Sequence, residues 1–216
     1  DPAQLIATVP VSNLNFNWTV PDTIGGNLKI KVTQTGSVPN DAFDESNAAF
    51  AIKGSLTITA PNGSDNFFVG QNHNITWTKT GTIGNVKLVY STDGGATYPE
   101  PDNVIVSGIA ASALSYTWSV ADAIDTDVRV KVILLSDSLV QDASNANFNI
   151  KGFLNLTSPL GGQTWEVGTT QAITWTRNGA SMGDIEIRYS TDGGTAYPGV
   201  VVAKVASGAL CANGLI

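Results

Sequence analysis

The chain repeats itself at an interval of about one hundred residues, and this repeat limits its fold more than any other feature. FAIKG at residues 50–54 returns as FNIKG at residues 148–152, which is a shift of 98 residues. ITWT at residues 75–78 returns at residues 173–176 with the same shift. The sequence therefore predicts tandem copies of one module of about 98 residues.

The copies are cut at an unusual point of the repeat. Residues 55–152 make one complete module, whereas residues 1–54 match only its second half and residues 153–216 match only its first half. We therefore expect a half module, a complete module and a second half module, in that order. On this interpretation the chain starts and stops in mid-module.

Apolar and polar residues alternate through the complete module, which predicts strands with one buried face. The first strand holds Leu56, Ile58 and Ala60, and six more are expected at residues 74–78, 86–90, 104–106, 114–118, 128–134 and 148–150. No segment has the spacing of an amphipathic helix. Short strands separated by turn residues predict an all-β fold of tandem Ig-like or fibronectin-like antiparallel β-sandwich modules.

Four tryptophans occupy equivalent strand positions and are predicted to belong to the core. Trp77 and Trp175 lie in phase with the isoleucines of the two ITWT strands, and Trp18 and Trp118 lie in phase with apolar residues of another strand. Because alternate residues of a strand point to the same face, all four are expected to point inward.

The sequence YSTDGG occurs twice and is typical of a turn. It places Asp93, Gly94 and Gly95 after one strand and Asp192, Gly193 and Gly194 after its equivalent. Asp-Gly and Gly-Gly supply the positive φ angles that tight hairpin turns require. A metal-binding or catalytic role for the two aspartates is the alternative, but neither turn has a neighbouring acidic ligand.

The residue types needed for catalysis or transition-metal binding are scarce. His73 is the single histidine, and Gln171 stands at its position in the next copy, so we expect a surface histidine. The sequence offers no His or Cys spacing for a metal and no repeated triad, which predicts a non-enzyme without a cofactor. Calcium at a module junction stays an alternative, because carboxylates are paired at residues 44–45 and at residues 125 and 127. Cys211 is the single cysteine, so no internal disulfide can form.

Charge and composition restrict the partners. Only 13% of the residues are charged and the net charge is −7, so no basic surface is expected to bind a nucleic-acid backbone. No apolar run is long enough to span a bilayer. The polar residues are mostly Ser, Thr and Asn, which is typical of secreted or cell-surface proteins. We therefore expect an extracellular location.

Several motifs together resemble a known family. They are SPLGGQTWEVGTTQAITWTRNG (158–179), IEIRYSTDGG (185–194), SYTWSV (115–120) and DASNANFNI (142–150). Their order resembles the Ig-like repeat of secreted and surface proteins of bacteria and archaea, and is similar to the fungal Ser/Thr-rich GPI-anchored cell-wall domain. The resemblance implies extracellular β-sandwiches in tandem, acting as spacers, stalks or adhesive surfaces, with no catalytic residue to transfer. One departure is ALCANGLI (209–216), which lacks the tryptophan of ALSYTWSV (113–120).

Three functions remain open at this point. The first is a structural module of an extracellular fibre, filament or stalk, whose partners are neighbouring modules of a longer array or other copies of the chain, joined head to tail by complementary half modules. The second is a carbohydrate-binding or adhesive surface, for which four aromatic residues in turn-rich stretches are the candidate contacts: Phe67, Tyr98, Trp165 and Tyr197. The third is an accessory region of a secreted hydrolase.

Overall fold

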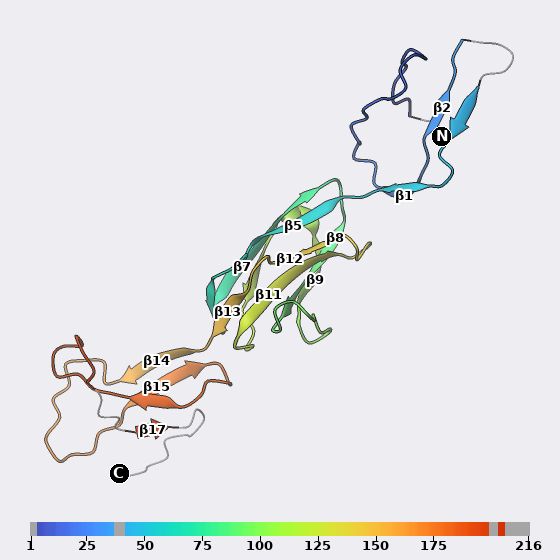
Figure 1. Cartoon of the computed structure of the whole chain (residues 1–216). Coiled ribbons are helices and arrows are strands. Elements are labelled where there is room, and N and C mark those ends of the chain that lie inside the picture. Colours follow the sequence, from blue (N-terminus) through green and yellow to red (C-terminus); the bar gives the residue numbers. More distant parts are fainter. Residues whose placement is uncertain (1–3, 37–41, 199–202, 206–216) are drawn as a thin grey trace.

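The computed structural model describes residues 4–36, 42–198 and 203–205. These residues are all-β, with no α-helix and a single short 3-10 turn at Ala111–Ala113. Three units follow one another along the chain, and the middle unit lies between the two outer ones (Figure 1). No helix in this part of the chain is long and apolar enough to cross a membrane.

The middle unit is a β-sandwich of two sheets. The smaller sheet has the order β10-β7-β5, formed by Ser115–Ser119, Asn72–Thr80 and Ser55–Ala60. The larger sheet has the order β6-β13-β11-β8-β9, formed by Asn66–Phe68, Phe148–Lys151, Asp125–Leu134, Asn85–Ser91 and Val104–Ala110, and β12 (Gln141–Ala143) also pairs with β11. The predicted fold class is confirmed: tandem Ig-like or fibronectin-like sandwich modules, antiparallel except for the pair β6 and β13.

The middle unit has nine strands, whereas the alternating pattern predicts seven. The two additional strands are β6 and β12, each three residues long. Three residues are too few to show a period of two, so only their pairing with β13 and β11 identifies them as strands.

The core of the middle unit fills the space between the two sheets. Trp77 of the smaller sheet is 2% exposed and Trp118 is 4% exposed, while Val128, Val130 and Val132 of β11 are fully buried. The indole Nε1–H of Trp77 donates a hydrogen bond of 2.9 Å to the carbonyl oxygen of Ala111. The largest buried side chain therefore also satisfies its one polar atom, which is the normal requirement for a buried tryptophan.

Each outer unit consists of short two-stranded pairs. In the first unit β1 (Gly25–Leu28) pairs with β4 (Phe50–Ile52), and β2 (Lys31–Thr33) pairs with β3 (Phe43–Glu45). In the third unit β14 (Phe153–Ser158) pairs with β15 (Thr174–Asn178), and β16 (Ile185–Ile187) pairs with β17 (Ala203–Val205). Most of these strands are shorter than the equivalent strands of the middle unit.

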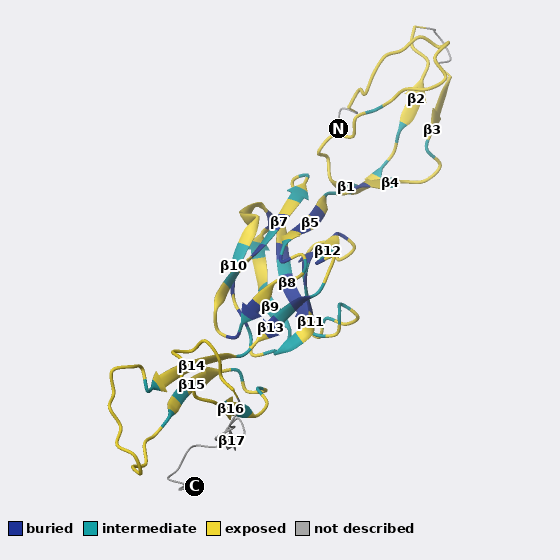
Figure 2. Ribbon diagram, turned by 60° about the vertical axis from the view of Figure 1, so that its left-hand side comes forward, coloured by how far each residue is buried: buried dark blue, intermediate teal, exposed yellow. Residues whose placement is uncertain are grey.

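Burial separates the middle unit from the outer units in the described residues. Buried positions concentrate in the middle unit, while the outer units are mostly exposed (Figure 2). The prediction of a core position must be corrected for Trp18 and Trp175, which are only partly buried. Trp18 makes an edge contact with Phe50, at 6.4 Å between ring centroids. The reason is the half-module architecture, since each ring faces one layer instead of two.

Candidate functional site

Phe67 is a core residue and not an exposed contact for a ligand. It is 7% exposed, and its ring centroid lies 4.9 Å from that of Phe148. The expectation of a surface histidine is also wrong: the His73 ring stacks on Phe67 at 3.8 Å, and its buried Nε2 has no hydrogen-bond partner in the described structure. The short strand β6, which the sequence pattern does not reveal, turns Phe67 toward the core.

The other three candidate aromatics lie at separate places. Tyr98 lies in the connection between β8 and β9, where the Lys131 ammonium sits 3.8 Å from its ring centroid. Burial raises the pKa of the Tyr98 hydroxyl. Trp165 and Tyr197 are 43% and 53% exposed and belong to the third unit. Within the described residues no ring contact joins any two of the four, so they do not form an aromatic platform.

In the first YSTDGG turn, the Asp93 carboxylate forms its hydrogen bonds with neighbouring residues of the same loop. The Asp93 carboxylate accepts hydrogen bonds from the Ser91 hydroxyl at 2.5 Å, from the Thr97 amide at 2.9 Å and from the Thr97 hydroxyl at 2.5 Å. These bonds, led by that from Ser91, hold the pKa of Asp93 well below its usual range. Gly94 and Gly95 have φ angles of 70° and 90°, which glycine adopts without strain.

The second turn repeats the first. The Asp192 carboxylate accepts from the Ser190 hydroxyl at 2.5 Å and from the Ala196 amide at 3.0 Å, and its pKa is lowered mainly by Ser190. Gly193 and Gly194 have φ angles of 73° and 93°. The expectation of a tight hairpin needs correction, because the motif opens a connection between β8 and β9 that runs over residues 92–103.

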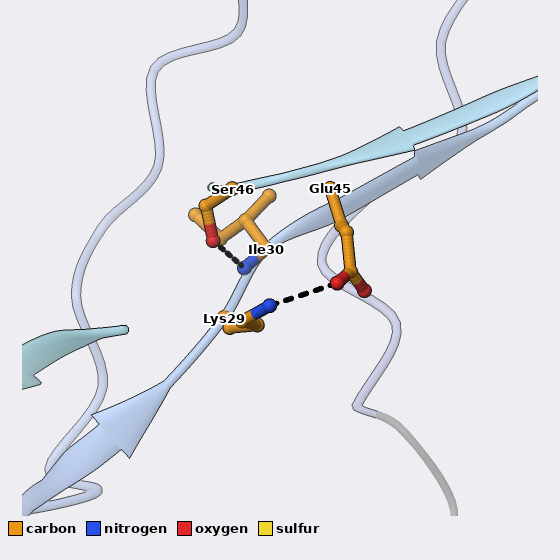
Figure 3. Close-up of polar contacts among 4 residues, drawn as sticks. All are labelled: Lys29, Ile30, Glu45 and Ser46. Atoms are coloured by element: carbon orange, nitrogen blue, oxygen red, sulfur yellow. Dashed lines mark hydrogen bonds and ion pairs between the residues drawn. The ribbon is translucent and has the colours of Figure 1, made fainter. Parts of the chain in front are cut away.

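Asp125 and Glu45, each a member of one of the two carboxylate pairs, have partners inside the protein. Asp125 accepts hydrogen bonds from the amides of Thr126 and Asp127, at 2.7 and 2.9 Å. Glu45 pairs with Lys29 at 2.8 Å (Figure 3), and this bond lowers the pKa of Glu45. No group of three or more His, Cys, Asp or Glu residues that could hold a metal occurs in the described ranges. Cys211 lies outside them.

Equivalent contacts occur at the two junctions, one between the first and middle units and one between the middle and third units. At the first junction the Asp22 carboxylate accepts hydrogen bonds from the amide of Thr82 at 2.8 Å and from its hydroxyl at 2.6 Å. The hydroxyl bond is the main reason why the pKa of Asp22 is lowered. The loop that carries Thr82 is itself held by Lys79, whose ammonium donates to the carbonyl of Gly81 at 2.8 Å.

The second junction has the same construction. The Asp122 carboxylate accepts a hydrogen bond of 2.7 Å from the amide of Ala180. Arg177 takes the place of Lys79 and donates to the carbonyl of Gly179 at 2.6 Å. An open, shallow hollow beside this contact is lined by Val69 and Gly70 on one side and by residues 177–180 on the other. The two units therefore meet through a defined polar contact.

Glycines allow the close approach at both junctions. A Cβ atom on Gly54 would lie 2.5 Å from the carbonyl oxygen of Thr80, and a Cβ atom on Gly152 would lie 2.5 Å from the side chain of Met182. An isoleucine completes each contact: a Cβ atom on Gly81 would lie 3.1 Å from Ile24, and one on Gly179 would lie 2.8 Å from Ile124. The equivalent residues thus pack in the same way twice.

The sequence itself identifies these junctions, although not through the alternation of apolar and polar residues. Asp22 and Ile24 stand one hundred residues before Asp122 and Ile124, and both pairs follow the equivalent sequences WTV (18–20) and WSV (118–120). Because these residues lie between predicted strands, the search for core and catalytic patterns passes over them. Repetition of polar residues outside the strands is the feature that identifies them.

Comparisons with known proteins give little similarity. No protein-family model matches the sequence, and no curated protein matches it. Among solved structures, the chain is similar to a fibronectin(III)-like module of CbhA from Clostridium thermocellum, at 18% identity and a TM-score of 0.31. The match covers 44% of this chain and 95% of that module. The strand pairings and the core described above establish the fold independently of this similarity.

Proposed function

We propose that the chain is a structural repeat of an extracellular fibre or stalk, and that its junctions stiffen the array. The observation that carries this proposal is the recurrence of one contact at both junctions, with Asp22 bound to the Thr82 amide and Asp122 bound to the Ala180 amide. A contact that only joined two particular units would have no reason to recur one module later.

The short connections support a stiff array. Strand β4 ends at Ile52 and β5 begins at Ser55, while β13 ends at Lys151 and β14 begins at Phe153. Linkers that act as flexible tethers are longer and rich in Gly and Ser. Here the connection is at most two residues long, so successive units cannot turn far without breaking the junction contacts.

The strength of each junction is moderate. Its hydrogen bonds are exposed to solvent, so each contributes only modestly to stability. The apolar contact of the isoleucine with the glycine pair adds to them. Together with the short connections, these contacts restrain the angle between units, which suits a stalk that transmits extension.

The composition supports an extracellular location for such a stalk. Charged residues make up 13% of the chain, against roughly 25% in an average soluble domain, and Ser, Thr and Asn supply the polar surface. Phe67 is buried and Tyr98 is half-buried within the module, which weakens the carbohydrate-binding alternative. Trp165 and Tyr197 remain as its exposed candidate contacts.

Distances between spin labels across the second junction test the proposed stiffness. The exposed residues Ser112 and Asn155 are replaced by cysteine in a Cys211→Ser background, and the labelled chain is measured by pulsed electron paramagnetic resonance. We expect one narrow distance distribution, which Asp122→Ala broadens. Asp184→Ala is the matched control, because this exposed carboxylate makes no hydrogen bond within the described chain. An equally broad distribution in the unmodified and Asp122→Ala chains would contradict the proposal.

A further inference from the structure

We propose that the middle unit resists stretching along the array, and that one seam between two of its segments carries the tension. The proposal rests on the proposed structural function and adds mechanical resistance to it. The seam consists of residues 62–69, which follow β5, and residues 145–151, which end at the second junction. Its strand directions and hydrogen bonds are the observations that support the proposal.

Tension reaches the middle unit from its two opposite ends. The first unit is connected to it through Gly54, directly before β5, and the third unit is connected through Gly152, directly after β13. The two connections lie at opposite ends of the middle unit (Figure 1). A pull on the outer units therefore draws the start of β5 and the end of β13 in opposite directions.

The seam contains the parallel strand pair of the middle unit. Strand β6 pairs with β13 in parallel, with Asn66 opposite Asn149 and Phe68 opposite Lys151. Parallel strands slide along each other when one is pulled from its N-terminal end and the other from its C-terminal end. All bonds between them are then stretched together. Antiparallel strands pulled from adjacent ends separate one bond at a time, so the seam is the more resistant arrangement.

Strand β5 precedes the seam on the pulled segment and does not replace it. β5 covers only Ser55–Ala60, and its strand partner is β7. If β5 detaches from β7, a few residues are released and the tension passes to residues 62–69. The chain between β6 and β13 extends only after the seam has broken, so the seam decides when the unit unfolds.

Hydrogen bonds extend the seam beyond the three paired residues of β6. The Asn62 side-chain oxygen accepts a bond of 2.6 Å from the Asn145 amide at one end. Each segment also donates backbone bonds to the other. These bonds run from the Ser64 amide to the Asn147 carbonyl at 3.1 Å, from the Asn149 amide to the Asp65 carbonyl at 2.9 Å and from the Val69 amide to the Lys151 carbonyl at 3.0 Å.

Side chains reinforce the seam on both of its faces. On the outer face the Asn149 side-chain amide donates a hydrogen bond of 3.0 Å to the Asn66 side-chain oxygen. On the inner face Phe67 and Ile150 are 7% and 1% exposed and belong to the core. Water therefore has access to the seam bonds from one face only. This restricts the replacement of a stretched bond by a bond to water.

The pair β7 and β10 provides a matched comparison outside the seam. These strands are antiparallel, with Asn74 opposite Thr117, and the Thr117 hydroxyl donates a hydrogen bond of 2.8 Å to the Asn74 side-chain oxygen. Neither strand adjoins an outer unit in the chain. We therefore expect this pair to be intact when the seam breaks. A substitution raises the rate of unfolding only where its interaction is already lost at the barrier.

Three double variants of the full chain test this difference. The seam-repelled chain carries Asn66→Asp with Asn149→Asp, and the seam-attracted chain carries Asn66→Asp with Asn149→Lys. The control chain carries Asn74→Asp with Thr117→Asp, which also places like charges directly opposite across two strands. Each chain is stretched between tags at its two ends in optical tweezers, and the unfolding rate is measured at constant force, where the barrier to unfolding governs it.

Unfolding of the middle unit is recognised by the length of chain that it releases. Residues 55–151 should release about 30 nm, because an extended residue spans roughly 3.5 Å. Urea unfolding of the same chains measures the loss of equilibrium stability. A variant that only weakens the fold is thereby distinguished from one that weakens the path of the tension.

We expect the seam-repelled chain to unfold about fivefold faster than the unmodified chain at the same force. The control chain should change by about twofold or less, even where urea shows a similar loss of stability, and the seam-attracted chain should return toward the unmodified rate. Equal acceleration of the seam-repelled and control chains, no acceleration of either, or a seam-attracted chain as fast as the seam-repelled one would each overturn the proposal.

A second pair of variants applies if the repelled chain does not fold. Asn66→Ala and Asn74→Ala each remove one side-chain oxygen that accepts a hydrogen bond across two strands, and only Asn66→Ala should raise the unfolding rate under force. Equal rates for these two chains would overturn the proposal. The spin-label distances across the second junction do not depend on the seam, so failure of the seam is distinguished from failure of the stiff junction.

Discussion

The backbone amide of Ile58 and the carboxylate of Asp142 form a hydrogen bond of 2.7 Å between strands that are 84 residues apart in the chain. Ile58 belongs to β5 of the smaller sheet, and Asp142 belongs to β12 beside the larger sheet. The bond therefore ties the two layers of the sandwich at an edge where no strand pairing connects them.

Loss of this bond should destabilise the middle unit. Asp142→Ala leaves the Ile58 amide without its acceptor, which costs about 1 to 3 kcal/mol when the amide is shielded from water. Urea unfolding of the variant and of the unmodified chain measures the change. Asp44→Ala is the matched control, since Asp44 stands at the position of Asp142 in the first unit and its carboxylate accepts no hydrogen bond within the described residues, so the unfolding free energy should be unchanged. Equal losses for the two variants would refute the assigned role of Asp142.

Replacing the equivalent tryptophans should reduce the unfolding free energy by different amounts in the middle and third units. Trp77→Ala removes a side chain that is 2% exposed, which costs roughly 3 to 5 kcal/mol of unfolding free energy. Trp175→Ala should cost much less, because the same position is only partly buried in the third unit. Thermal melts of both variants measure the difference. A larger loss for Trp175→Ala than for Trp77→Ala would show that the third unit has a core of its own.

The sequence predicts the sandwich because apolar and polar residues alternate along long strands such as β7, β8 and β11, and this alternation indicates which face is buried. It does not predict the position of Phe67, because β6 is three residues long and pairs in parallel with β13, whose paired residues lie 83 positions further along the chain. The interpretation of His73 fails for the same reason, since its ring stacks on Phe67. The alternation of apolar and polar residues does not predict the junction contacts. The repetition of Asp and Ile residues between the strands does indicate them.

The turn at Asp93 should contribute stability that depends on pH. Its folded pKa is depressed below the ordinary value of 3.8, so the contribution is present above about pH 4 and is lost as the pH falls below that value toward the folded pKa. The melting temperature of Asp93→Asn should therefore lie below that of the unmodified chain at pH 6, with the gap closing toward pH 2. A gap that is constant over this range would show that the carboxylate charge does not hold the turn.

The two junction glycines should respond differently to a methyl group. Gly54→Ala brings Cβ to 2.5 Å from the Thr80 carbonyl oxygen, which belongs to the backbone, whereas Gly152→Ala meets the flexible side chain of Met182. We expect Gly54→Ala to broaden the distance distribution across the first junction and Gly152→Ala to have a smaller effect across the second. Gly84→Ala is the control, because no atom lies within 4 Å of its added Cβ. A Gly152→Ala effect equal to or larger than that of Gly54→Ala would be inconsistent with the close approach described here.

Residual dipolar couplings of the chain test the central claim, that it is a stiff structural repeat, most directly. Backbone amide couplings are measured in a weakly aligning medium for the middle unit and, separately, for residues 153–187. The account predicts one common alignment tensor for both sets, which Asp122→Ala splits into two of different magnitude. Two different tensors in the chain with an intact Asp122–Ala180 contact would contradict it.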